Sequence, residues 1–219
     1  MITLAVDAST YAGSVCVARG REVVAAHDVA MRDAQRERLM PAVAATLADA
    51  GVDIQHVDRL VCGAGPGSFT SLRIAAAIAK GLAMTVGRPL YAVSSLALMV
   101  GAVEPPPAPG EYVAVLDALR SEAYAATCVV DHVGDVADIG AVRLVRAEEV
   151  DALGQSGRLV VGEGRRVRGA PNARGVVRVT PLLEREGPAD LALWEPDYGR
   201  VAEAQRHWEA AHGQALPRA

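Results

Sequence analysis

Residues 63–86, GAGPGSFTSLRIAAAIAKGLAMTV, constrain the fold more than any other stretch of this chain. A turn rich in glycine and proline follows an apolar strand and opens a helix that is apolar on nearly every side. Backbone N–H groups at such a helix start can hold an anion or a backbone partner. A helix without a polar face must be covered on more than one side. The stretch therefore fits either a nucleotide site or a surface for a partner protein.

The composition favours a cytoplasmic protein with a substantial core. Half of the residues are apolar, and the net charge of −4 argues against a generally basic surface for nucleic acid. Met1 leads directly into a strand pattern rather than a secretory signal. Lys80 and Arg88 bracket the best apolar run, so we expect no membrane span. Three widely separated cysteines in apolar runs are expected to be buried, reduced thiols: Cys16, Cys62 and Cys128.

The first half of the chain alternates strand and helix patterns. The expected strands are 2–6, 14–19 and 22–29, which form an antiparallel meander, followed by 59–63 and 90–93. The expected helices are 33–50, 68–86 and a third that runs from Ser94 or Ser95 to about residue 103. Pro41 lies inside the first helix pattern, where it either kinks the helix or marks its first turn. Gly51 ends that helix, and Ser68 or Thr70 caps the next one.

The segment EPPPAPG, residues 104–110, is the clearest linker in the chain. The second half is expected to hold strands 112–117, 122–130, 140–145, 159–161 and 176–180, with helices 147–153 and 201–212. The two halves share a weak repeat, because an Asp-Ala pair ends the first strand of each and a cysteine lies in each return strand. These pairs begin at Asp7 and Asp117. We therefore predict a first lobe at 1–103 and a smaller second lobe at 111–219.

This order of elements predicts an α/β protein with a duplicated ribonuclease-H-like fold. Each lobe holds a mixed β-sheet flanked by helices, as in the actin, Hsp70 and sugar-kinase superfamily. In such folds a nucleotide binds in the cleft between the lobes, and acidic residues at strand ends hold its metal ion.

Several segments resemble the bacterial TsaB (YeaZ) family, which takes part in making threonylcarbamoyladenosine at position 37 of tRNAs. The matching segments are ITLAVDAST…GSVCVA, GAGPGSFTSLRIAAAIAKGLA, LYAVSSL, LDALRSEAYAA and the late WEPDYGR. Residues 130–193 match only loosely. Many members carry a histidine ahead of the first helix, in H-x-x-R-L-x-P, where this chain has Gln35. This chain therefore departs from the family pattern at that position.

The resemblance implies a catalytically inert subunit that pairs with the catalytic TsaD-type subunit and with a TsaE-type ATPase. It implies tRNA contact only through that complex, and no membrane association. Family members pack the two helices, here 33–50 and 68–86, against the matching pair of TsaD, and the same face can form a homodimer. The residues expected at this partner interface are Leu39, Val43, Leu47, Arg73, Ile74, Ala75, Ile78, Ala79 and Leu82. We expect Ala79→Glu or Ile78→Asp to abolish association while leaving the fold intact.

The alternative is a small ATPase or kinase-like protein that binds a nucleotide in the cleft. A vestigial site of this kind would use Asp7, Ser9, Gly65, Gly67, Ser68 and Asp117. The loop at 63–68 fits neither a P-loop nor G-x-G-x-x-G, and Pro66 removes one N–H donor, so a tight structural turn is favoured. An aspartate before a turn is also ordinary turn chemistry. We assign no cofactor, and leave open weak binding of ATP or ADP with Mg²⁺, with Gly162, Glu163 and Gly164 as the remnant of an adenosine pocket.

Metal and protease chemistry are set aside. The histidines form no H-x-x-x-H or H-E-x-x-H pair, so no metal ligands are assigned. Ser68 does not lie in G-x-S-x-G. A third reading, direct tRNA binding, would use a cluster of arginines at 158, 165, 166, 168, 174 and 178. No aromatic residues are interleaved with them for base stacking, so a solvated surface is favoured.

Overall fold

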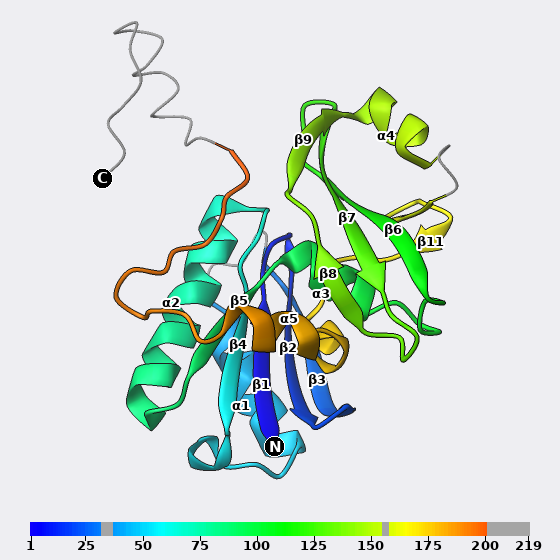
Figure 1. Cartoon of the computed structure of the whole chain (residues 1–219). Coiled ribbons are helices and arrows are strands. Elements are labelled where there is room, and N and C mark those ends of the chain that lie inside the picture. The colour runs from blue at the N-terminus through cyan, green and yellow to red at the C-terminus, as the bar shows by residue number, and fades with distance from the viewer. Residues whose placement is uncertain (32–36, 155–157, 201–219) are drawn as a thin grey trace, which may run out of the picture.

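Two mixed β-sheets, one from each half of the chain, form the framework of the molecule (Figure 1). The computed structural model describes residues 1–31, 37–154 and 158–200. This architecture confirms the predicted α/β class with a mixed sheet in each lobe. The predicted start of the first helix at 33–36, including Gln35, and the predicted helix at 201–212 lie outside the described residues.

The first sheet has the strand order β3-β2-β1-β4-β5. Its strands are β1 (Ile2–Asp7), β2 (Ala12–Arg19), β3 (Glu22–Ala30), β4 (Arg59–Gly63) and β5 (Leu90–Val93). The first three are antiparallel, as the meander prediction requires, and β4 and β5 lie parallel to β1. Every residue of β4 is buried, which is typical of a parallel strand covered on both faces.

Helices cover both faces of the first sheet. α1 (Leu39–Asp49) and α2 (Phe69–Val86) pack on one face, and α3 (Ser95–Gly101) lies on the other. Pro41 falls in the first turn of α1, so it starts the helix rather than kinking it. By length and composition α2 alone, among the described residues, could cross a membrane, but six of its residues are buried as in a core helix.

The second sheet has the order β11-β10-β6-β7-β8, and β9 pairs with β7. Its strands are β6 (Gly110–Asp117), β7 (Glu122–Val130), β8 (Val136–Ile139), β9 (Arg143–Arg146), β10 (Leu159–Gly162) and β11 (Val167–Arg168). The helical elements of this half are α4 (Ala147–Gly154), the 3-10 helix η2 (Ala173–Arg178) and α5 (Thr180–Glu186), and a further 3-10 helix, η1 (Ile54–His56), precedes β4. The single strand expected at 140–145 is wrong, because β8 and β9 are separate strands.

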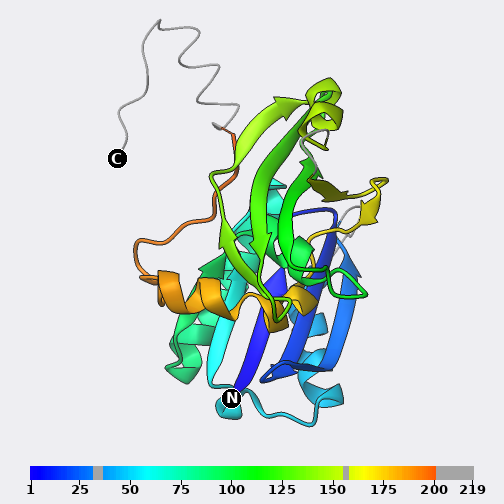
Figure 2. The same ribbon diagram turned by 45° about the vertical axis from the view of Figure 1, so that its right-hand side comes forward.

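The strand expected at 176–180 is also wrong, because these residues end η2 and begin α5. A short apolar run cannot be assigned to strand or helix by periodicity alone. Tertiary packing decides here, since the backbone of Gly175 lies directly against α3, where a methyl group would meet the Leu98 carbonyl oxygen at 2.1 Å. η2 and α5 lie against the first sheet, although they come from the second half of the chain (Figure 2). The boundary at residue 111 stays a prediction.

α3 joins the two sheets into one core. All seven of its residues are buried, and its apolar side chains share a cluster with residues of both sheets, among them Val61 and Ala126. Ser94 caps the helix by accepting a hydrogen bond from the Leu96 N–H at 3.2 Å. The position of one lobe on the other therefore depends on a short apolar helix.

Leu98→Ala should lower the free energy of unfolding by about 2–5 kcal/mol, because Leu98 is fully buried and a cavity would remain in the shared cluster. Denaturant unfolding measures this loss. Met40→Ala on α1 is the control, since Met40 is 41% exposed and should cost far less. Equal losses in the two variants would contradict a core centred on α3.

Candidate functional site

The structure divides the nine residues expected at the partner interface into a buried group and an accessible group. Leu39, Val43, Ala75 and Ala79 are at most 1% exposed and pack in the core between α1, α2 and the first sheet. Their assignment to the surface is corrected. A glutamate at Ala79 would bury a charge in this core, so Ala79→Glu is expected to destabilise the fold rather than leave it intact.

The accessible group lies on both helices and is apolar except for Arg73. Ile74, Ile78 and Leu82 recur every fourth residue along one flank of α2 and are partly buried, while Arg73 is exposed. Leu47 of α1 is also partly buried. Small exposed residues lie around these side chains: Ala44, Ala48, Ala77 and Gly81. We call Leu47, Ile74, Ile78, Leu82 and these four small residues the α1–α2 surface.

The opposite flank of α2 is covered by the chain itself. Residues 187–200, here called the tail segment, run beside α2 (Figure 1). The Trp194 ring lies 5.5 Å from the Lys80 ammonium, and the rings of Phe69 and Tyr198 are 4.6 Å apart. In the sequence this segment stands out only as a match to the family, and its position beside α2 was not predicted. The one feature of the sequence that could have indicated its packing is the presence of Trp194 and Tyr198 in a chain with few aromatic residues.

The 63–68 loop is filled by other parts of the chain. A methyl group at Gly65 would lie 2.0 Å from the Asp197 carbonyl oxygen, and one at Gly67 would lie 2.0 Å from that of Ser9. The Ser68 N–H donates to the Ser9 carbonyl at 2.7 Å, and the Gly65 N–H donates to the Ser95 hydroxyl at 3.1 Å. Several segments of the chain thus pack closely against one another at this loop. This geometry favours the structural turn over a phosphate cradle.

Asp7 lies in the protein interior, not in a cleft. Its Oδ1 accepts hydrogen bonds from the N–H and the hydroxyl of Ser9, and its Oδ2 accepts one from the Ser95 hydroxyl at 2.5 Å. Burial raises the pKa of Asp7, and the hydrogen bonds from Ser95 and Ser9 oppose that shift. Protein donors thus occupy both oxygens, and the hydrogen bond from Ser95 to Asp7 holds β1 against α3.

Asp117 and Asp7 are not brought together. Asp117 is exposed at the end of β6, and its Oδ1 accepts the Leu119 N–H at 2.8 Å, which is the turn chemistry of an ordinary aspartate. It lines a cleft of about 950 Å³ between the two halves, together with Thr10, Glu122, Glu163 and Gly164. Neither Asp7 nor any residue of the 63–68 loop is among the described residues that line this cleft. The expected vestigial site is therefore split between an interior cluster and a cleft.

Metal ligands are not gathered in the described part of the chain. Within residues 1–31, 37–154 and 158–200, no three His, Cys, Asp or Glu side chains lie close enough to hold one ion. The three cysteines are free and buried, as expected, and burial raises the pKa of the Cys16 thiol to about 12.

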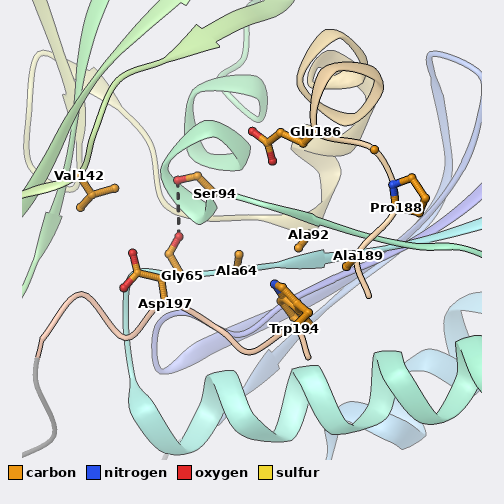
Figure 3. Close-up of a pocket in the computed structure, with 11 residues that line it drawn as sticks. Ala64, Gly65, Ala92, Ser94, Val142, Glu186, Pro188, Ala189, Trp194 and Asp197 are labelled. Atoms are coloured by element: carbon orange, nitrogen blue, oxygen red, sulfur yellow. Dashed lines mark hydrogen bonds between the residues drawn. The ribbon is translucent and has the colours of Figure 1, made fainter. Parts of the chain in front are cut away.

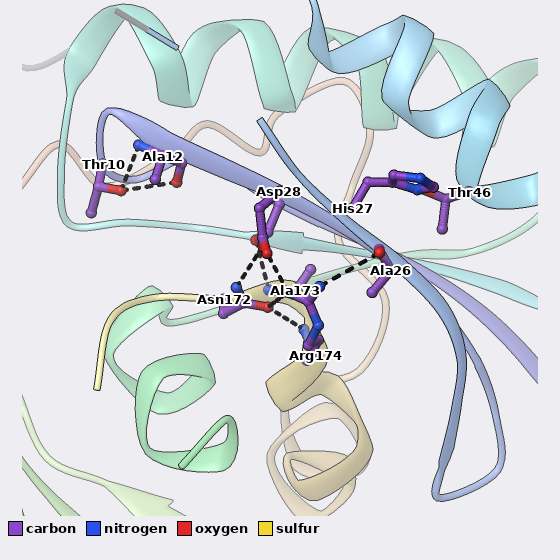
Figure 4. A network of polar contacts seen from close by, with 10 residues as sticks. Thr10, Ala12, Ala26, His27, Asp28, Thr46, Asn172, Ala173 and Arg174 are labelled. Carbon is purple, nitrogen blue, oxygen red and sulfur yellow. Dashed lines mark hydrogen bonds and ion pairs between the residues drawn. The ribbon is translucent and has the colours of Figure 1, made fainter. Parts of the chain in front are cut away.

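Several of the clustered arginines bind protein acceptors and tie the two halves together. Asp28 of β3 accepts hydrogen bonds from Arg174 at 2.7 Å and from Asn172 at 3.0 Å (Figure 4). Partial burial opposes the charge of Asp28, but these hydrogen bonds outweigh it and lower the pKa. Arg178 donates to the carbonyl oxygens of Gly101 and Val103, both at 2.9 Å. These contacts assign the two arginines to structure rather than to RNA.

The burial of Asp7 makes the stability of the fold depend on pH. Since its pKa is raised on folding, the folded state holds the proton more tightly, and stability falls as pH rises from 3.8 through the raised value. Asp7→Asn removes this titration, so its unfolding free energy should fall less over that window than that of the wild type. Denaturant unfolding as a function of pH measures the difference, and Asp117→Asn at the exposed turn is the control. Parallel profiles for the wild type and Asp7→Asn would contradict the assignment.

Comparison with known proteins places the chain in a family. The model of the family "TsaD: tRNA N6-adenosine threonylcarbamoyltransferase" matches residues 29–164. The chain is similar to the tRNA threonylcarbamoyladenosine biosynthesis protein TsaB of Haemophilus influenzae, with 36% identity over 121 residues, 55% of this chain and 51% of that protein. It is 33% identical over 124 residues to the TsaB of Escherichia coli, covering 57% and 53% of the two chains. The chain thus spans about half the length of the curated relatives it matches.

The similarity to solved structures extends over nearly the whole fold. YeaZ from Pseudomonas aeruginosa superposes with a TM-score of 0.74 at 26% identity, over 90% of this chain and 99% of that chain. A second structure, described as an uncharacterized protein with similarity to peptidase YeaZ from the same organism, gives a TM-score of 0.75 at 27% identity, over 91% and 99%. Together with the matched family model, these similarities show that the chain belongs to the TsaB/YeaZ family.

Proposed function

We propose that this chain is a non-catalytic subunit of the machinery that makes threonylcarbamoyladenosine at position 37 of tRNAs, and that it binds a TsaD-type catalytic subunit through the α1–α2 surface. The names of its relatives support a role in this process. The single observation that carries the partner role is the apolar α1–α2 surface, which stays accessible after the tail segment has covered the other flank of α2.

The chemistry of the α1–α2 surface suits a pair of helices from another subunit. Ile74, Ile78 and Leu82 offer apolar area, and Ala77 and Gly81 carry little side chain beside them. Apart from its chain neighbours and the backbone of its own helix, Gly81 has no atom within 4 Å of the position a Cβ would take, so the backbone there is open to close approach. Apolar area exposed on two adjacent helices is typical of a protein interface, which buries about 1,200–2,000 Å² in total.

In this proposal the same surface also forms a homodimer when the protein is isolated. A two-fold dimer uses one patch on both copies, so a TsaD-type subunit and a second copy would compete for it. A TsaE-type ATPase joins the complex, tRNA is bound only through the complex, and assembly takes place in the cytoplasm.

The interior bonding of Asp7 and the filled 63–68 loop support a subunit without its own catalysis. If the chain were instead a small ATPase, Asp7 and the 63–68 loop would have to face a nucleotide. The cleft with Asp117, Glu163 and Gly164 is the observation that favours this alternative. Calorimetry with Mg-ATP separates the two: micromolar binding that is lost in Asp117→Ala would support the ATPase, and absence of binding would support the partner subunit.

Ala77→Arg should disrupt association, because it places a long charged side chain in the middle of an apolar interface while leaving the core intact. We expect affinity for a TsaD-type subunit to fall at least about tenfold, and the isolated protein to become monomeric. Light scattering and calorimetry measure the two effects, and reconstituted tRNA modification should fall in parallel.

Ala141→Arg is the matched control, since Ala141 is exposed in the other half of the chain, between β8 and β9. It should associate and support modification like the wild type. Failure of the wild-type protein to bind a TsaD-type subunit would overturn the proposal, as would modification activity of this chain alone.

A further inference from the structure

A cavity of about 360 Å³ opens at the carboxyl ends of β4 and β5 (Figure 3). Ala64 and Gly65 follow β4 and Ser94 follows β5, and all three line the cavity. The chain leaves β4 for α2 on one face of the sheet, whereas it leaves β5 for α3 on the opposite face. A crevice where neighbouring strands send their helices to opposite faces is the place where open α/β sheets bind ligands.

The tail segment builds the outer wall of this cavity. It is tied to the sheet at two points, since the Ala189 N–H donates to the Leu90 carbonyl at 2.7 Å and the Asp197 N–H donates to the Ala64 carbonyl at 2.7 Å. Between these points the segment bows outward, and the Trp194 ring lines the space. The cavity therefore has walls held by backbone hydrogen bonds rather than by loose side chains.

The lining has the charge of a cation site. Glu186 and Asp197 contribute carboxylates, and Figure 3 shows them on either side of the Ser94 hydroxyl. Among the described residues that line the cavity there is no lysine, arginine or histidine. Apolar groups make up the rest, with the Trp194 ring as the largest. A donor-rich cation with an apolar stem complements such a lining, because carboxylates accept its hydrogen bonds and the indole ring accommodates its methylene groups.

The groups nearest to the cavity engage one oxygen of each carboxylate and leave the other oxygen available. Arg185 is held by Asp138 at 2.6 Å and reaches Glu186 only at 3.7 Å. Lys80 lies over the Trp194 ring from the side of α2. One oxygen of Asp197 accepts the Gly199 N–H at 2.8 Å, which fixes the direction of the carboxylate.

We propose that this cavity binds an aliphatic ammonium cation, held by Glu186 and Asp197 with its stem against Trp194. The site is separate from the α1–α2 surface and does not depend on the function proposed above. A small free amine and a lysine side chain of another protein carry the same ammonium group.

The test is an NMR titration of the full chain with 1,4-diaminobutane, with 1,4-butanediol as the neutral probe of the same shape. We expect amide shifts confined to Ser94, Gly187, Ala189 and the Trp194 indole. Glu186→Gln and Asp197→Asn should each weaken binding about tenfold, since each removes one charge-assisted hydrogen bond. Glu184→Gln is the matched control, because Glu184 is exposed on the same helix, α5, but does not line the cavity.

Nα-acetyl-lysine amide distinguishes the two sources of the ammonium group. Tighter binding of the diamine supports a small free amine, and tighter binding of the lysine derivative supports a side chain. Equal binding of 1,4-butanediol would overturn the cation site. The same conclusion would follow if neither amine shifted these resonances, or if Glu186→Gln and Asp197→Asn bound 1,4-diaminobutane as the wild type does.

Discussion

The close packing at the 63–68 loop is the constraint on which the rest of the structure depends. Gly65 and Gly67 let the carbonyl oxygens of Asp197 and Ser9 approach to distances that no side chain would permit. Gly63 likewise leaves room for the Asp7 carboxylate, because a methyl group at Gly63 would overlap that carboxylate. Three separate segments thus meet at one turn. That turn sets the direction of α2, and with it the α1–α2 surface.

The tail segment, which packs against this turn, also contacts the second sheet. Its Tyr198 carbonyl accepts a hydrogen bond from the Tyr124 hydroxyl at 3.2 Å, and Arg200 donates to the Ala118 carbonyl and to Glu122 at 2.6 and 2.7 Å. On the far side, Arg21 and Asp135 join the turns of the two halves at 2.5 Å. Ion pairs and hydrogen bonds therefore join the two halves at two separate places. Such a frame would keep the α1–α2 surface fixed for the partner proposed above.

Much of the first lobe could be predicted from the sequence, because its signals are local. Alternation of apolar residues gave the meander, and helical spacing gave α1 and α2. In the second half the apolar run around Val176 was assigned to a strand, and it became helical because Gly175 packs against α3. The interface residues show the same limit. Leu39 and Ala79 satisfy the helical apolar pattern as well as Leu47 and Ile78 do, and only burial tells the core side from the accessible side.

The sequence by itself determined the α/β class, the glycine-dependent turn at 63–68 and the family, because residue types and spacing within a short segment carry those signals. The tertiary structure alone decided where Asp7 points, which flank of α2 the tail segment covers, and that a cavity opens beside Trp194. Each of these depends on contacts between residues far apart in the chain. Their geometry follows from packing, which no local pattern records.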